Sequence, residues 1–214
     1  LHASCPLGDL EVAFIIDSSG SMVRNDKERL RVSKSEEFIE ALSAPKNIAA
    51  RFNSRGYLLS SSQSVSYVKS TFNLVGQTVG TNIGDGLEKA FNAFSANGTG
   101  QKIAILLTDG KSSESKINAM LTKAKDEKIK IFTIGLGSPA QLNEALLLRL
   151  AKETGGQYYH VAKNIDIGTA YQSILSDITC GVPVESCALP SQAFSSPTIE
   201  YTSSDVFMYT DVKE

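Results

Sequence analysis

The chain of 214 residues is long enough for one well-buried α/β domain and a short additional segment. Hydrophobic residues make up 42% and charged residues 21%, so the body of the chain has no composition typical of disorder. No apolar run reaches the ~18 residues of a membrane span. The formal net charge of -2 indicates no polyanionic partner such as nucleic acid. Because no long apolar run is present, we expect no membrane insertion by this segment. The chain begins at Leu1 without an initiator Met or an apolar signal region, so we expect a processed or excised fragment.

Strand-like and amphipathic helical segments alternate along the chain, which predicts a doubly wound α/β fold. We expect a mostly parallel six-stranded sheet with helices on both faces. The strands are predicted at 11–16, 48–52, 57–59, 102–107, 130–136 and 157–161. Asn53-Ser54-Arg55-Gly56 favours a hairpin turn between the second and third strands, so one short edge strand should run antiparallel.

Two sets of apolar residues recur at helical spacing, and each predicts one stripe facing the core. They are Ile83, Leu87, Ala90, Phe91 and Phe94, and Ile117, Met120, Leu121 and Ala124. Further helices are expected near 26–42, 63–72, 141–153 and 167–179. In the last helix, Ile174, Leu175 and Ile178 are the predicted core contacts.

Three predicted loops carry short oxygen-bearing side chains where a cation could be held. Asp17-Ser18-Ser19-Gly20-Ser21 follows the apolar run 12–16, and Thr108-Asp109-Gly110 follows the apolar strand 103–107. The third loop is 80–84, which contains Thr81. A hard divalent ion takes about six oxygen ligands. Loops at the carboxyl ends of parallel strands converge, so these side chains are expected to meet.

These three segments, in this order, resemble the metal-ion-dependent adhesion site of the von Willebrand factor type A family, over roughly residues 9–180. The resemblance implies that the metal residues are Asp17, Ser19, Ser21, Thr81 and Asp109. It implies that the hydroxyls bind the ion directly, that one or both carboxylates act through water, and that one position is left for a partner's Glu or Asp. We expect Mg2+, with Mn2+ able to substitute, and the lack of a Cys/His cluster argues against zinc.

The nucleophilic and basic side chains of the chain give little support to an enzymatic function. Ser19 and Ser21 lack the Gly-x-Ser-x-Gly elbow, and the only histidines are His2 and His160. The glycines of 80–86 are not followed by the Lys-Ser/Thr of a phosphate-binding loop. We therefore expect no enzymatic activity, and we expect His160 to be a partly exposed structural residue.

The predicted domain spans 9–180, and residues 181–214 are predicted to be a Pro/Ser-rich acidic linker or arm, or the start of another module. Extracellular members of the resembled family often link their termini, so Cys5 and Cys180, which bracket the α/β pattern, could form a disulfide. Cys187 would then be free or bonded elsewhere. The alternative is three reduced thiols in a cytosolic protein.

The resemblance implies an extracellular module, secreted or at the cell surface, that binds a protein ligand through the metal. The alternative is a structural extracellular-matrix protein that joins collagen-like or other fibrous partners, with a partly structural metal. A third hypothesis is an intracellular chaperone-type member of the family, but the placement of the cysteines argues against it.

Overall fold

The computed structural model describes residues 9–180 except 97, 99 and 113–115. It contains a six-stranded sheet in the order β3-β2-β1-β4-β5-β6. The strands are β1 (Glu11–Asp17), β2 (Lys46–Phe52), β3 (Gly56–Ser62), β4 (Lys102–Thr108), β5 (Ile129–Leu136) and β6 (Tyr158–Val161). Five strands run parallel, and the edge strand β3 runs antiparallel to β2. The predicted fold class is confirmed.

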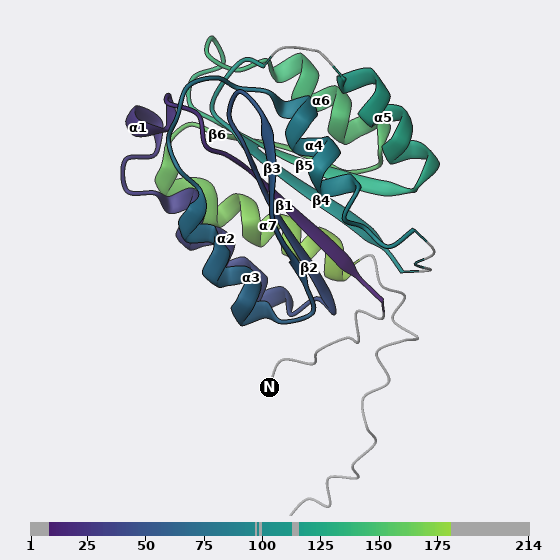
Figure 1. The fold of residues 1–214 in the computed structure, drawn as a ribbon. Coiled ribbons are helices and arrows are strands. Elements are labelled where there is room, and N and C mark those ends of the chain that lie inside the picture. Colours follow the sequence, from purple (N-terminus) through teal and green to yellow (C-terminus); the bar gives the residue numbers. More distant parts are fainter. Residues whose placement is uncertain (1–8, 97, 99, 113–115, 181–214) are drawn as a thin grey trace, which may run out of the picture.

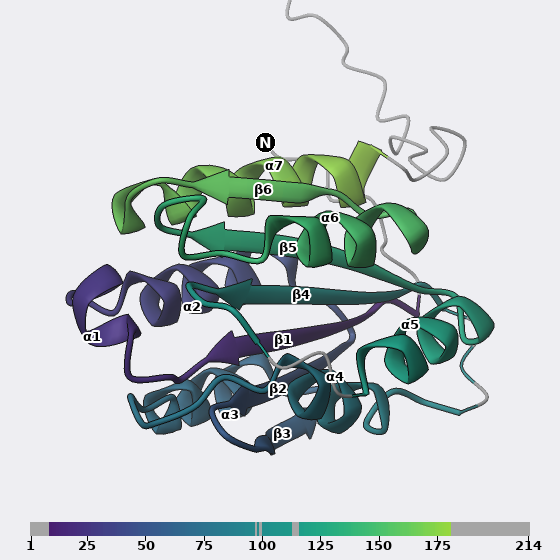
Figure 2. The same cartoon turned by 90° about the horizontal axis from the view of Figure 1, so that it is seen from above.

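Helices cover both faces of the sheet (Figures 1 and 2). On one face lie α2 (Leu30–Leu42), α3 (Val65–Thr71) and α7 (Ile167–Cys180). On the other lie α4 (Ile83–Phe91), α5 (Ile117–Asp126) and α6 (Glu144–Glu153). The short helices α1 (Met22–Asn25), η1 (Phe72–Leu74) and η2 (Asn164–Asp166) lie in the connections. Both stripes predicted from helical spacing pack into the core.

The central strand β1 shows why its sequence is apolar throughout. Val12, Phe14 and Ile16 pack against the face covered by α2 and α7, whereas Ala13 and Ile15 pack against the opposite face. Successive side chains of a strand point to opposite faces, so a strand covered on both sides has no solvent-facing positions. Every residue of β1 is buried. Its carboxyl end is therefore a rigid point from which a loop can be presented.

Two predicted elements differ most from the structure. The helix expected over 26–42 begins only at Leu30, as α2, after Arg29, which has a left-handed φ of 57°; the separate short helix α1 ends before the predicted range, at Asn25. The Asp26 carboxylate accepts a hydrogen bond from the Leu30 backbone N–H at 2.7 Å and so caps α2. Strand β3 is longer than the expected 57–59, because its serines pair with β2 as far as Asn47 and Ser62.

The last helix packs as predicted. Ile174 and Ile178 are buried, and Leu175 packs against the same cluster, so their core role is confirmed. Cys5, Cys187 and the predicted linker 181–214 lie outside the described residues, and Cys180 is the last residue of α7. Within the described ranges, no helix combines the length and apolar character that crossing a bilayer would require.

Candidate metal centre

The candidate site lies where the strand order of the sheet reverses. Strand β1 pairs with β2 on one side and with β4 on the other, and all three run parallel. The loops that leave β1 and β4 therefore emerge side by side at the carboxyl edge. Figure 2 shows α1, which follows the β1 loop, at this arrowhead end of the sheet. Ligands of open α/β sheets bind in the crevice at such a reversal point.

The loop after β1 is folded around its own carboxylate. Asp17 is the last residue of β1 and is fully buried, and its Oδ1 accepts a hydrogen bond from the Ser19 backbone N–H at 2.7 Å. Ser18 points elsewhere, because its hydroxyl donates to the Phe52 carbonyl oxygen at 3.0 Å. The tight turn therefore presents alternate side chains, those of Asp17, Ser19 and Ser21, to the same place.

Asp109, one residue beyond β4, meets the serines of the first loop. Its Oδ1 accepts a hydrogen bond from the Ser21 hydroxyl at 2.6 Å, and the Ser19 hydroxyl lies 3.5 Å from the same oxygen. The two serine hydroxyls are 2.9 Å apart. Four of the five predicted metal residues are thus brought together from segments that lie about ninety residues apart in sequence.

Thr81, the fifth predicted residue, approaches from the loop before α4. A side chain on Gly110 would place its Cβ 3.6 Å from Thr81 Oγ1 and 4.0 Å from Ser21 Oγ. The Thr81 loop is attached to the first loop, because the Thr78 backbone N–H donates to the Ser18 carbonyl at 2.8 Å. The small residue after Asp109 therefore lets three loops meet around one point.

Two residues of the site had no role in the sequence-based prediction. The Thr108 hydroxyl donates to Asp17 Oδ2 at 2.6 Å, and the Asn25 side-chain amide donates to Asp109 Oδ2 at 2.9 Å. Each orients one carboxylate. Asn25 stands four residues after Ser21, about one helical turn, so a short helix after the first loop would have been the signal.

The electrostatics of the site are unfavourable for two carboxylates. Burial raises the pKa of Asp17 to about 6, and the charge of Asp109 acts in the same direction, against hydrogen bonds from Thr108 and Ser19. Among the described residues, no ion pair joins a Lys or Arg to either carboxylate. A cation would relieve this repulsion.

The donor set consists mainly of hydroxyls. In the part of the chain that the structure describes, no group of three or more His, Cys, Asp and Glu side chains is placed to hold a metal. Two carboxylates with three neutral hydroxyls fit a small hard ion that prefers oxygen. The residues present therefore fit Mg2+ or Mn2+, and they contain no soft ligand.

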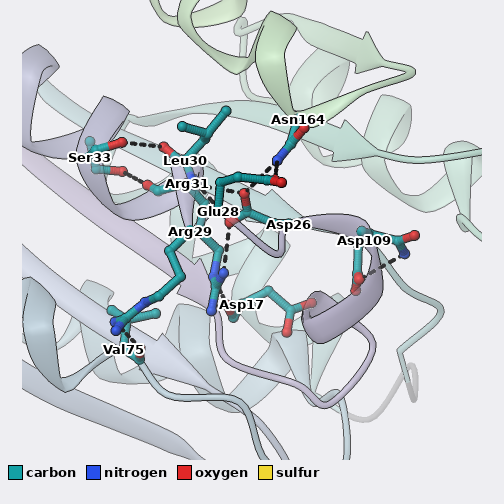
Figure 3. A network of polar contacts seen from close by, with 12 residues as sticks. Asp17, Asp26, Glu28, Arg29, Leu30, Arg31, Ser33, Val75, Asp109 and Asn164 are labelled. Atoms are coloured by element: carbon teal, nitrogen blue, oxygen red, sulfur yellow. Dashed lines mark hydrogen bonds and ion pairs between the residues drawn. The ribbon is translucent and has the colours of Figure 1, made fainter.

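A buried ion pair lies next to the first loop and is hydrogen-bonded to its backbone (Figure 3). Arg31 is fully buried, and its guanidinium donates to Asp26 Oδ2 at 2.7 Å, to the Asp17 carbonyl at 3.0 Å and to the Gly76 carbonyl at 3.1 Å. Asp26 also accepts from Asn164, which precedes α7. Arg31 thus joins the loop that bears Asp17 to the segment that leads to Thr81.

His160 takes no part in this arrangement. It is exposed, and its Nε2 lies 2.7 Å from the Gly137 carbonyl oxygen. This agrees with the structural role that the sequence predicted for it.

A family model, the von Willebrand factor type A domain, matches residues 11–173, which is most of the chain. The chain belongs to this family. The match includes all three loops of the site. No curated protein matches the chain.

Solved structures share the fold of this von Willebrand factor type A domain. One is an aerotolerance-related membrane protein from Bacteroides fragilis NCTC 9343, with 22% identity and a TM-score of 0.64 over 80% of this chain and 99% of that one. Another is proximal thread matrix protein 1 from the mussel byssus, whose metal-ion-dependent adhesion site (MIDAS) motif is occupied by zinc. It shares 22% identity and has a TM-score of 0.69 over 81% of this chain and 46% of that one.

A third similar structure is the domain of the type V pili tip protein Mfa5 from Porphyromonas gingivalis, with 15% identity and a TM-score of 0.65 over 81% of this chain and 96% of that one. The family's solved relatives thus include matrix and pilus proteins. At these identities, the similarity establishes the shared fold.

Proposed function

We propose that this chain is a non-enzymatic extracellular adhesion module that binds a protein partner through a divalent metal. Asp17, Ser19, Ser21, Thr81 and Asp109 would hold Mg2+, and a Glu or Asp of the partner would complete the coordination. The observation that carries the proposal is the pair of buried carboxylates at the reversal point of the sheet, surrounded by hydroxyls. Mn2+ should substitute, because it accepts the same oxygen ligands.

The protein's own residues prepare such a site. Thr108 and Asn25 each fix one carboxylate, so the acceptor oxygens are oriented before anything binds. The hydroxyls of Ser19, Ser21 and Thr81 add neutral oxygens, which bind a cation without adding negative charge. When bound, the metal would supply net positive charge that attracts an incoming carboxylate.

The relatives support the assignment to adhesion. One is a matrix protein of the mussel byssus with a metal in the corresponding motif, and others are a pilus tip protein and a minor pilin. An extracellular location is part of the proposal, and a Cys5–Cys180 disulfide remains a prediction that peptide mapping without reduction would test.

Calorimetry with Mg2+ tests the metal site directly. We expect Asp17→Ala and Thr81→Ala to abolish or strongly weaken the binding heat while the domain stays folded, because neither residue belongs to the apolar clusters on the two faces of the sheet. Ser18→Ala is the matched control, since Ser18 lies in the same loop but its hydroxyl points to Phe52. Undiminished Mg2+ affinity in Asp17→Ala would refute the assignment. Parallel titrations with Mn2+ and Zn2+ establish the preferred ion.

Surface plasmon resonance against a panel of matrix proteins tests the adhesive role. In Mg2+ we expect binding that EDTA weakens at least ~10-fold, about 1.4 kcal/mol, and that Thr81→Ala weakens equally. Binding that EDTA leaves unchanged would place the working surface elsewhere. The structural-matrix alternative, with a partly structural metal, would then be the better account.

A further inference from the structure

Two exposed apolar side chains lie close in sequence to the predicted metal residues. Val79 is 88% exposed, more than any other large hydrophobic residue among those described, and Val23 is 51% exposed. Val79 precedes Thr81 by two residues, and Val23 follows Ser21 by two residues. Val79 therefore lies in the loop that carries Thr81, and Val23 lies in α1, which directly follows the loop that carries Ser21.

Val79 is held in position by backbone hydrogen bonds on both sides. Its carbonyl accepts from the Ser54 N–H at 3.2 Å, Thr78 pairs with Ser18, and the Asn82 N–H donates to the Asn53 carbonyl at 2.7 Å. Gly80 takes a φ of 93°, where a side chain would come within 2.8 Å of Ser54. An apolar side chain on a loop fixed in this way is preorganised to bind, because little further order is needed.

Exposed cations follow the carboxyl ends of the neighbouring parallel strands β1, β2 and β4. Arg24, Arg55 and Lys111 are exposed, and within the described ranges none of them forms an ion pair. Some lysines elsewhere are paired, such as Lys116 with Asp85 and Lys125 with Glu153, whereas others, such as Lys128, also form no ion pair within the described ranges. Exposed acids also occur in the connections, such as Glu28 before α2 and Asp166 before α7.

These observations identify the chemistry of a partner. We propose that this surface binds an extended, acidic segment of a partner protein, in which the coordinating Glu or Asp stands next to a large apolar residue that covers Val79. The inference rests on the proposed metal-dependent function and specifies its ligand. Covering Val79 would remove its apolar surface from water, and the unpaired cations favour further acids in the segment. A sulfated polysaccharide would satisfy the cations but offers little apolar surface to Val79.

Selection of random peptides displayed on phage, with the immobilised protein in Mg2+, tests the inference without a known ligand. We expect enriched peptides to carry Asp or Glu beside Leu, Ile, Val or Phe. As synthetic peptides they should bind in Mg2+, lose binding in EDTA and weaken with rising salt. Val79→Ser should weaken them ~10-fold without changing Mg2+ affinity. Leu148→Ser is the matched control, because Leu148 is 52% exposed on α6, outside the metal loops. It should change neither quantity.

The possible outcomes separate the two proposals. Mg2+-dependent peptides without an apolar neighbour of the acid, and unaffected by Val79→Ser, would overturn this inference and leave the metal-dependent function standing. Peptides that bind equally in EDTA would overturn the metal-dependent function itself. Absence of any enrichment over a blank surface, or binding of a sulfated oligosaccharide that Val79→Ser does not change, would also overturn the inference.

Discussion

Each end of strand β1 holds a buried carboxylate, and the surroundings shift the two pKa values in opposite directions. At the amino end, Glu11 accepts a hydrogen bond from the Ser95 N–H at 3.0 Å and pairs with Lys46 at 3.0 Å. Burial acts to raise the pKa of Glu11, but these contacts hold it below its usual value. At the carboxyl end, Asp17 is fully buried beside Asp109, and its pKa rises to about 6.

This difference indicates that the fold is less stable than it could be at the carboxyl end of β1, where the candidate metal site lies. Both carboxylates lose hydration, yet only Glu11 has a cationic side chain in contact. The guanidinium of Arg31 contacts Asp17 only at its backbone carbonyl, and it pairs instead with the carboxylate of Asp26. A buried group whose pKa is raised by burial and by a like charge is typical of a functional site.

The largest expected effect concerns the one buried ion pair at the carboxyl end. Arg31→Met should lower the free energy of unfolding by ~3–5 kcal/mol, because it leaves the buried Asp26 without its cation. Urea denaturation measures this loss. Lys34→Ala removes the exposed pair with Glu37 in the same helix and should cost less than ~1 kcal/mol. Equal small losses in both variants would show that the buried pair does not support the site.

Asp17→Asn should change the free energy of unfolding in the opposite direction. Without divalent metal at pH 7, it should raise the free energy of unfolding by up to ~3 kcal/mol, because the neutral amide keeps the shape and removes the repulsion with Asp109. The folded pKa of about 6 lies above 3.8, so the unfolded chain ionises first and wild-type stability is lost as pH rises between these values.

Urea denaturation of the wild type and of Asp17→Asn at several pH values checks this prediction. The stability difference should be small below pH 4 and should grow until about pH 6. A difference that does not vary with pH would contradict it. Added Mg2+ should stabilise the wild type and leave Asp17→Asn unchanged.

Glu11→Gln completes the comparison with a smaller loss. It should reduce the free energy of unfolding by about 1.5–3 kcal/mol, because hydrogen bonds to a charged group are lost while Lys46 keeps its charge. The loss should lessen as pH falls and Glu11 becomes protonated in the wild type. Thermal unfolding at pH 7 and pH 3 measures both values. A stabilising Glu11→Gln would mean that the two ends of β1 do not differ in the way described.

The sequence predicted most of the fold because its patterns are local. Strands covered on both faces need continuous apolar runs, such as those in β1 and β4, and helices on a sheet need one apolar stripe. Where the pattern was weak, the prediction erred. The serines of β3 carry no strand signal, and only pairing with β2 extends that strand to Ser62.

The order of the loops along the chain likewise determined which oxygen-bearing residues to expect at the site. The structure brings Asp17, Ser19, Ser21 and Asp109 together by hydrogen bonds, with Thr81 beside Gly110. Only the tertiary structure showed that Thr108 and Asn25 orient the carboxylates, because their partners lie 91 and 84 residues away in sequence. It also showed that Arg31 links the first loop to Gly76, which lies 45 residues away. Burial and unpaired charge depend on the whole packed fold, so the raised pKa of Asp17 and the exposure of Val79 could not be derived from local pattern.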